Sequence, residues 1–365
     1  MIFAGWVWPV GVALGMICGT QLWIVDRVVE VGEQVPFGHF WSPAPPMFWL
    51  YTFYAVGICT AATFGIRKLR GRRLLLRLLA LWFLFGLSYH PVRTFIRIYL
   101  VNSEQMAITF LDVGHGAHLW IETPDNQLWC YDAGRMGDHE RSYRAMVDAL
   151  WASGHSQIDT LILSHADADH FNAMPGIVQR FHVGRFVTTP QVLSHPDPLL
   201  ATVKSKLTRF SVPTIEWKRG DYEEHSQWQV MALHPPPLDV GRNDNANSLC
   251  LVLEYAGRKI FLPGDLEPPG TSMVLAQPPL DVDVLLAPHH GSLHAQSDKV
   301  LAWCDPDIVV ISGSQRAATP KVVETFSSND RKLYVTARDH AVRVTILKNG
   351  DIQIRTWQRD DWESQ

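Results

Sequence analysis

Residues 161–170 read LILSHADADH, an apolar run that ends in two imidazoles and two carboxylates within six residues. Such a run predicts a buried strand that places these side chains at its carboxyl end. Charged groups crowded at one strand end are costly to bury unless a cation lies among them. A polar loop whose aspartates cap a helix is the alternative, and the density of ligand groups disfavours it. We therefore expect His165, Asp167, Asp169 and His170 to bind a divalent metal.

Two later segments repeat this arrangement of a strand followed by metal-binding residue types. Residues 260–265 read IFLPGD, which places Asp265 behind a glycine that permits close approach. Residues 282–292 read VDVLLAPHHGS, which places His289 and His290 directly after an apolar strand. Each segment alone is weak evidence, but the order of all three predicts that they converge on one metal site.

The chain from Met106 onward consists of short apolar runs separated by Gly, Pro and Asp, which predicts strands and helices packed in layers. Several predicted strands follow one another directly, so we expect mixed sheets and not a doubly wound parallel sheet. The predicted strands are residues 106–111, 118–122, 127–132, 160–164, 228–233, 249–255, 259–263, 282–287, 307–311 and 342–347. The predicted helices are residues 139–152, 171–181, 198–209, 297–303 and 320–327. The acidic residues 360–363 are expected to form a frayed tail.

The first hundred residues differ in composition, with long apolar runs and a net charge of +6, against −10 for the remainder. Residues 2–25 and 44–66 carry no charge, and each is longer than the roughly 20 residues that cross a bilayer. Residues 78–92 are a shorter run, which extends to 74–92 if Arg77 reaches the membrane surface. We expect three transmembrane helices near these positions. A cleaved signal peptide is disfavoured for the first because a basic start is absent.

Six cations lie between Arg67 and Arg77, in the connection between the second and third apolar runs. They could bind nucleic acid, but beside membrane helices such a cluster is more often a cytoplasmic loop. Three crossings then place the domain after residue 100 outside the cytoplasm. The five cysteines show no CxxC spacing, which argues against a zinc ribbon or a disulfide framework.

The motifs HxDxDH, GD and HHGS, in this order, resemble the metallo-β-lactamase superfamily. One branch is more similar still, the ComEC family of competence proteins for DNA uptake. The features that resemble it are Asp167 in place of a second histidine, DVGHG at residues 112–116, DAG at 132–134 and NSL at 247–249. Residues 1–100 look like the end of that family's channel-forming region, and 101–365 look like its metallo-β-lactamase-like domain. The family's more N-terminal portion is expected to lie outside this sequence.

The resemblance implies a four-layer αβ/βα sandwich with metal ions at one edge, preceded by about three transmembrane helices. It implies that His165 and Asp167 hold one metal, that Asp169 and His170 hold a second and act in catalysis, and that Asp265 bridges the two. One of His289 or His290 would complete the second site, with a slight preference for His289. Exchanging imidazole for carboxylate shifts the expected metal from zinc toward manganese or magnesium, with one or two ions bound.

Some family positions differ in this chain. His115 and Ala117 replace the Gln and Asp of the usual DVGQGD, and Ala318-Thr319-Pro320 stands where a His-Pro pair is usual. His115, His118 and His340 could compensate, but a solvated or structural role is favoured for each.

Three functions therefore compete. The preferred one is a membrane-anchored nuclease, a DNA phosphodiesterase that acts on single-stranded or incoming DNA, with separate channel or competence proteins as further partners. The second is a non-catalytic metal-binding component of an uptake channel. The third is hydrolysis of another ester. The −10 charge of the domain weighs against tight nonspecific DNA binding, although Lys204, Lys206 and Arg209 could form a local track.

Overall fold

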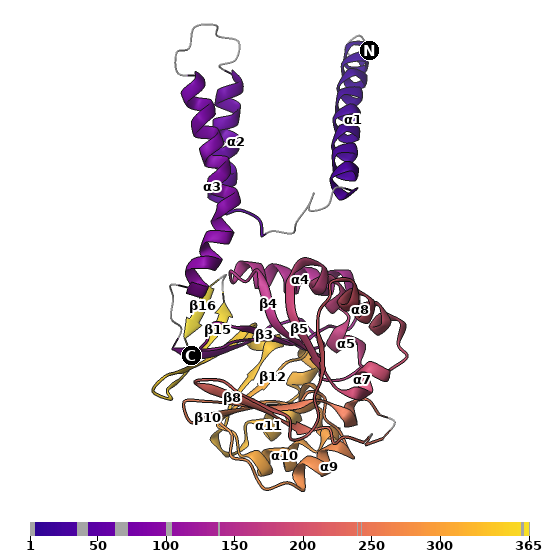
Figure 1. Cartoon of the computed structure of the whole chain (residues 1–365), viewed down its shortest axis with the longest axis vertical. Coiled ribbons are helices and arrows are strands. Elements are labelled where there is room, and N and C mark those ends of the chain that lie inside the picture. Colours follow the sequence, from indigo (N-terminus) through magenta and orange to yellow (C-terminus); the bar gives the residue numbers. More distant parts are fainter. Residues whose placement is uncertain are drawn as a thin grey trace. The chain divides into compact units, whose positions relative to one another are not determined.

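The computed structural model describes residues 4–34, 43–62, 72–99, 104–137, 139–238, 240–241, 243–358 and 361–364. Two compact units make up the chain, Met1–Ser42 and Pro43–Gln365. The first contains the helix α1 (Ala4–Gln34). The second contains a pair of helices and a domain of two sheets (Figure 1).

Helices occupy most of each of the three segments that were expected to cross a membrane, and residues 2–3 and 63–66 of these segments lie outside the described residues. α1 continues beyond the predicted end of the first segment, α2 spans Met47–Ala62, and α3 spans Arg72–Tyr99. Among the described residues, one segment, Arg73–Ile96, is long and apolar enough to cross a bilayer, and the apolar stretch Met47–Thr60 is shorter. By length and composition the structure thus supports one span, or two with the shorter stretch, and not the expected three.

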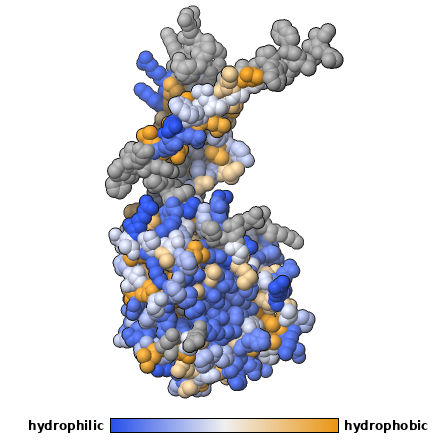
Figure 2. All heavy atoms as spheres, turned by 90° about the vertical axis from the view of Figure 1, so that its right-hand side faces the viewer, coloured by the Kyte–Doolittle hydropathy of each residue, from blue (hydrophilic) through white to orange (hydrophobic). Residues whose placement is uncertain are grey.

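α2 and α3 pack against each other through aromatic side chains. The Trp49 indole nitrogen donates a hydrogen bond to the Trp82 carbonyl at 2.6 Å, and the rings of Phe53 and Phe83 lie 5.9 Å apart. Other apolar side chains of α3 face outward, among them Leu81, which is 62% exposed, and Leu84, which is 58% exposed. The face of the two-sheet domain seen in Figure 2 is mostly hydrophilic. Apolar exposure on α3 is therefore typical of a surface that meets lipid or protein.

The domain contains one sheet of nine strands and one of seven. The first has the order β16-β15-β14-β1-β2-β3-β4-β5-β6, and the second has the order β13-β12-β11-β10-β9-β8-β7. Each sheet is mixed as expected, since β3 to β6 and β10 to β13 pair in parallel and the remaining pairs are antiparallel. The strands are β1 (Gln105–Phe110), β2 (His118–Glu122), β3 (Leu128–Ala133), β4 (Gln157–Ile162), β5 (His182–Thr188), β6 (Thr214–Glu216), β7 (Tyr222–Glu224), β8 (Trp228–His234), β9 (Cys250–Tyr255), β10 (Arg258–Leu262), β11 (Val284–Leu286), β12 (Ile308–Ile311), β13 (Lys332–Val335), β14 (Val342–Leu347), β15 (Ile352–Gln358) and β16 (Asp361–Ser364).

Helices cover the outer face of each sheet, which gives the layer order helix, sheet, sheet, helix. A central apolar core lies between the sheets and includes Phe110, Trp129 and Leu262. A second core joins the nine-stranded sheet to α4, α6 and α8, and a third joins the seven-stranded sheet to α9, α10 and α11. The helices of this domain are α4 (His139–Ala152), α5 (Ala168–Phe171), α6 (Met174–Arg180), α7 (Pro190–Ser194), α8 (Pro198–Arg209), α9 (Gly270–Leu275), α10 (Ser297–Cys304), α11 (Pro320–Phe326) and α12 (Thr336–Asp339). The sandwich expected from the motifs is therefore present.

Two expectations about local structure are wrong. The predicted helix 171–181 is two helices, α5 and α6, because Pro175 belongs to the first turn of a helix and restarts it at Met174. The predicted frayed tail forms β16, an edge strand on β15, in which Trp362 packs edge-on against Trp357 with the ring centroids 5.4 Å apart. An aromatic cross-strand pair outweighs the acidic character of this segment. Residues 359–360 lie outside the described residues.

Candidate metal centre

The carboxyl ends of several strands meet at one edge of the sandwich. β1, β3 and β4 of the nine-stranded sheet run in the same direction, and so do β10, β11 and β12 of the other sheet. Because the segments that follow these strands emerge at the same edge, residues more than a hundred positions apart come into contact. All seven predicted ligands lie at this edge.

The inner part of the site is a buried group of three ligands, His165, His170 and Asp265, whose potential ligand atoms all lie within 4.8 Å of one another. Nε2 of His170 is 3.2 Å from Oδ2 of Asp265, and the two imidazole centroids are 4.2 Å apart. Asp265 is also 3.3 Å from Nε2 of His290 and 3.7 Å from Nε2 of His289. This one carboxylate therefore faces three imidazoles.

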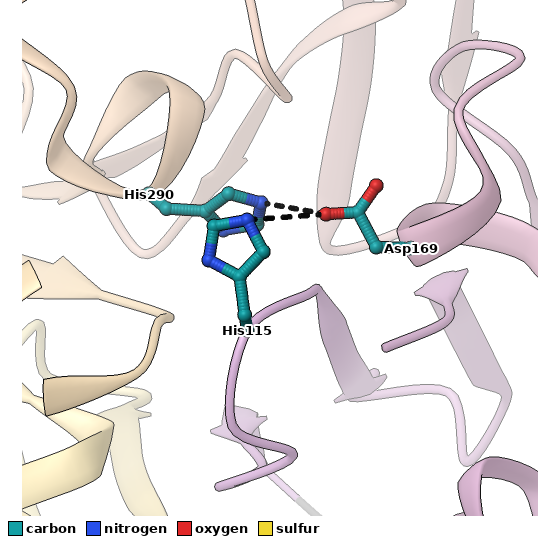
Figure 3. Close-up of side chains that lie close together, drawn as sticks. All are labelled: His115, Asp169 and His290. Atoms are coloured by element: carbon teal, nitrogen blue, oxygen red, sulfur yellow. Dashed lines mark ion pairs between the residues drawn. The ribbon is translucent and has the colours of Figure 1, made fainter. Parts of the chain in front are cut away.

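The outer part of the site is a second group of three, His115, Asp169 and His290 (Figure 3). Oδ2 of Asp169 lies 3.5 Å from Nε2 of His290 and 3.6 Å from Nε2 of His115. In Figure 3 both imidazoles point toward this one carboxylate oxygen. Because His290 also faces Asp265, the inner and outer groups adjoin.

Asp132, at the end of β3, orients the imidazoles of His165 and His170 through hydrogen bonds on the side away from Asp265. Its carboxylate accepts hydrogen bonds from the backbone N–H and the hydroxyl of Ser164, each at 2.8 Å, and from Nδ1 of His170 at 2.8 Å. Nδ1 of His165 donates to the same Ser164 hydroxyl at 2.8 Å. Both histidines therefore hold a proton on Nδ1, so Nε2 is the ring nitrogen that faces Asp265 and is placed to bind a metal.

The histidine pair is fixed by its backbone and by its own acceptors. His289 and His290 have φ angles of 47° and 53°, in the left-handed region that non-glycine residues seldom adopt, and such strain is typical of functional sites. Nδ1 of His290 donates to the Ser312 carbonyl at 2.8 Å, and Nδ1 of His289 donates to Glu267 at 2.6 Å. His290 is buried, whereas the side chain of His289 is 29% exposed.

The residues fit a divalent cation. Nε2 of His165, His170 and His290 is buried without a hydrogen-bond partner, which costs about 1 to 3 kcal/mol for each group. The imidazole to carboxylate distances of 3.2 to 3.7 Å are longer than the 2.8 Å bonds made by Nδ1 of His170 and His290. Two ligand atoms bound about 2.1 Å from one tetrahedral ion lie about 3.4 Å apart. The spacing therefore suits atoms that share an ion better than atoms that bond to each other.

The electrostatics of the site favour positive charge at its centre. Burial would lower the pKa of His170, but the charges of Asp265 and Asp132 raise it well above its usual value. Burial would likewise raise the pKa of Asp265, but His170 and His290 hold it well below its usual value. Burial, followed by the charge of His170, lowers the pKa of His165 to about 3. His165 is thus a neutral imidazole, the form that binds metals.

The remaining candidate residues lie around the two groups. Asp167 is more exposed, and its Oδ2 is 3.8 Å from Nε2 of His165. His118 is buried, with Nδ1 donating to the Asp132 carbonyl, and His340 faces Asp112 at 3.8 Å. Of the three histidines for which a solvated or structural role was favoured, the structure brings only His115 into a ligand group.

A cavity of about 520 Å³ opens beside the outer group. His115, His289 and His290 line one side, and Ser292, Ser314 and Arg316 contribute polar groups. Arg316 belongs to the 3₁₀ turn Gln315–Ala318, in the segment where the usual His-Pro pair is absent. This cavity can admit an anionic group next to the ligand cluster.

Sequence reasoning missed Asp132, Ser164, Glu267 and Ser312 as residues that position the site. The DAG motif at 132–134 was a usable signal, since an aspartate at a strand end beside an HxDxDH motif can orient its histidines. Glu267, two residues after Asp265, was a second signal. Ser312 gave none, because it holds His290 through its backbone carbonyl, which every residue type has.

Known proteins are similar to this chain in sequence. The family model for the metallo-beta-lactamase superfamily matches residues 130–313. ComE operon protein 3 of Bacillus subtilis (strain 168) is 26% identical over 275 residues, which cover 71% of this chain and 34% of that protein. Competence protein ComA of Neisseria gonorrhoeae is 24% identical over 235 residues, which cover 63% of this chain and 30% of that protein. The chain spans about a third of the length of these relatives.

A mutant of the CmlA beta-hydroxylase is a similar solved structure, with a TM-score of 0.43 and 14% sequence identity, covering 66% of this chain and 54% of that one. The curated relatives confirm the resemblance to ComEC-family competence proteins that the motifs indicated.

Proposed function

This chain belongs to the metallo-beta-lactamase superfamily, and we propose that it is a membrane-anchored, metal-dependent phosphodiesterase that cleaves DNA during uptake. The observation that supports the proposal most is the convergence around Asp265 and Asp169 of three Nε2 atoms that have no hydrogen-bond partner. The residues of this cluster come from both sheets. A hydrolase of this superfamily needs such a cluster, whereas a purely structural edge would pair these atoms with hydrogen-bonding groups.

We assign the inner cation to His165, His170 and Asp265, and the outer cation to Asp169 and His290, with Asp265 adjoining both. The distances favour this grouping over the pairing that the resemblance implied. His290 is preferred to His289 because it is buried and faces both carboxylates, at 3.3 and 3.5 Å. Asp167 flanks the inner cation from the solvent side, and His289 with Glu267 flanks Asp265. Manganese and zinc suit this mixture of imidazole and carboxylate, and magnesium is the harder alternative.

Two divalent ions in such a site would acidify a water molecule and stabilise the charge of a phosphodiester. The chain's own groups then have separate tasks. Asp132 keeps His170 protonated on Nδ1, so that Nε2 stays available. Arg316, Ser292 and Ser314 can hold a phosphate in the adjoining cavity, and the arginine offsets the negative charge of the domain there.

Helix α3, together with the shorter apolar helix α2, would anchor the domain in the cytoplasmic membrane. The competence-related relatives support an association with DNA uptake. In this proposal, incoming or single-stranded DNA is the substrate and separate channel or competence proteins are the partners. The exposed apolar side chains of α3 support a membrane location. With the basic segment 67–77 in the cytoplasm, the sandwich would lie outside it.

A non-catalytic metal-binding channel component is the second candidate. It is favoured by one feature, the sequence Ala318-Thr319-Pro320, which follows the cavity-lining residues Arg316 and Ala317 and offers no imidazole that could transfer a proton. Hydrolysis of another ester is the third, and the same assay addresses it.

The deciding experiment uses the full chain in detergent, freed of metal and reloaded with manganese, zinc or magnesium. Labelled single-stranded and double-stranded DNA are the substrates, and Asp265→Asn is the control because it removes charge without changing volume. We expect metal-dependent cleavage that the control abolishes. DNA binding without cleavage under all three metals would favour the channel component, and cleavage only of a generic phosphate or carboxylate ester would favour the third candidate.

A further inference from the structure

We propose that His115 is a ligand of the outer cation, so that His115, Asp169 and His290 form a three-residue metal site. None of the HxDxDH, GD and HHGS motifs includes this histidine. The inference deepens the proposed function and rests on it, because both require a cation at this edge of the sandwich.

The geometry of the outer group carries the proposal. Nε2 of His115 and Nε2 of His290 lie 3.6 and 3.5 Å from the same oxygen, Oδ2 of Asp169. The two imidazole centroids are 4.7 Å apart, and the rings converge from separate loops (Figure 3). These distances are too long for hydrogen bonds but match the separation of about 3.4 Å between two ligand atoms on one ion.

The loop that bears His115 is held against the loops of its two partners. Ala117 donates its backbone N–H to the Asp169 carbonyl at 3.2 Å, and Met136 donates to the His115 carbonyl at 2.6 Å. The Ser312 hydroxyl donates to the Gly116 carbonyl at 3.0 Å, while the Ser312 carbonyl accepts from Nδ1 of His290. Ser312 thus contacts both the His115 loop and His290. The position of the His115 loop is therefore set by hydrogen bonds to its backbone.

Gly116 makes this close approach possible. Its φ is 142°, and a Cβ at this position would lie 2.5 Å from Cα of Arg135 and 2.8 Å from the Asp169 carbonyl. A side chain would therefore push the loop away from Asp169. Glycine at position 116 therefore lets the His115 loop lie close to Asp169.

The other two candidate histidines lack these features. His118 donates its Nδ1 proton to the Asp132 carbonyl and lies in the core, outside both ligand groups. The side chain of His340 is 60% exposed and faces Asp112 at 3.8 Å, again outside both groups. His115 alone among the three shares a carboxylate oxygen with an imidazole of the HHGS motif. His340 consequently serves as a matched control.

The test measures cobalt binding to the full chain in detergent, after metal removal, by calorimetry and by the visible absorption of bound Co²⁺. The variants are His115→Gln, His115→Ala and the control His340→Gln. We expect the wild type to bind two equivalents. In both His115 variants the second equivalent should bind at least about 10-fold more weakly, since removing even an indirect partner of a metal costs 10- to 100-fold. Its absorption band should also change, while the first equivalent and the control should match the wild type.

If the first equivalent of Co²⁺ binds with unchanged affinity, the variants are folded at the site. The proposal is overturned if both His115 variants bind the second equivalent within about threefold of the wild type with the same spectrum, or if the wild type binds only one equivalent. A chain that binds no cation at all would overturn this proposal and the proposed function together. A chain that binds two cations and never cleaves DNA would contradict the proposed function alone.

Discussion

Asp132 acts on the site through hydrogen bonds to Ser164 and His170, and it is not itself a member of either ligand group. One of its carboxylate oxygens accepts from Ser164 Oγ and His170 Nδ1, and the other accepts from the Ser164 backbone N–H. All three partners donate, so the residue here must accept at both oxygens. An amide can accept at only one of its two terminal atoms.

The variant Asp132→Asn should therefore weaken metal binding by about 10- to 100-fold. In one amide orientation the NH₂ group faces Nδ1 of His170 and drives its proton to Nε2, and in the other it faces the Ser164 N–H. Calorimetric titration of metal into the metal-free chain measures the change. Asp159→Asn is the control, because Asp159 also accepts a backbone hydrogen bond, from Leu128 at 2.7 Å, but outside the site. Equal affinities in the two variants would refute the positioning role.

His118 should make the stability of the sandwich depend on pH. Burial lowers the pKa of His118 to about 4, below the value of about 6.5 for an exposed histidine. Between pH 4 and 6.5 the unfolded chain binds more protons at this residue, so stability is fully present above about pH 6.5 and is lost as the pH falls toward 4. From pH 7 to 5 this residue should remove about 2 kcal/mol from the free energy of unfolding.

The variant His118→Asn isolates this contribution, since its amide can still donate to the Asp132 carbonyl. Urea unfolding of the sandwich in the presence of a chelator, followed by tryptophan fluorescence at pH 7 and 5, should show a smaller loss in the variant. His234, whose pKa burial also lowers to about 4, supplies part of the remaining dependence in both proteins. An identical loss in the variant and the wild type would show that His118 is not the source.

The residues that the sequence predicted as ligands lie together in the structure, whereas the residues that support them were not predicted. His165 to His170, Asp265 and the histidine pair follow apolar strands in single short segments, so their residue types and order were visible along the chain. The roles of Asp132 and His115 depend on the pairing of β3 with β4 and on the contact of the 112–117 loop with Asp169. Such relations arise only when distant segments pack together.

The same contrast holds for helices and strands. The bounds of α8 were predicted correctly, because Asp197 caps its first turn, Pro198 follows, and Leu200, Val203 and Leu207 recur at helical spacing. β5 was missed, since Gly184 interrupts its alternation. That glycine lets the backbone pass close to Asp159, where a Cβ would lie 2.7 Å from the carbonyl oxygen. β6 and β7 were missed because three residues carry too little pattern.

Gly134, which follows β3, should be as necessary to the site as a ligand. A Cβ on this residue would lie 2.4 Å from the carbonyl carbon of Asp169 and 2.5 Å from the backbone nitrogen of His170. Neither atom can move without shifting the HxDxDH loop. The variant Gly134→Ala should therefore lose at least about 10-fold in metal affinity, as changes that displace ligands do.

Gly241→Ala is the matched control for this variant, because its nearest neighbours are side-chain atoms of Pro269 at 3.9 Å. Metal titration and the thermal unfolding midpoint are measured for both chains. Retention of wild-type metal affinity in Gly134→Ala would mean that the loop accommodates the added carbon without moving its ligands.

At the scale of the whole molecule, the site exists only because two sheets are packed together. The nine-stranded sheet supplies His115 and the residues from His165 to His170, and the seven-stranded sheet supplies Asp265, His289 and His290. The contact of the two helix-covered halves therefore forms the ligand cluster at its edge. If the chain spans a membrane and cleaves DNA as proposed, the side of the membrane on which this edge lies decides which DNA the site can meet.

The orientation can be tested with cysteine labelling, because the natural cysteines leave a clean background. Cys130, Cys250 and Cys304 are buried, and Cys18 and Cys59 can be replaced by serine. In that background, Leu238→Cys places a thiol at a residue of the sandwich that is 80% exposed, and Gly71→Cys places one in the basic segment. Since basic loops stay in the cytoplasm, a membrane-impermeant maleimide should label the Leu238→Cys chain in intact spheroplasts and the Gly71→Cys chain only after lysis. The opposite pattern would place the sandwich in the cytoplasm, where the proposed nuclease could reach DNA only after transport and not at the outer mouth of a channel.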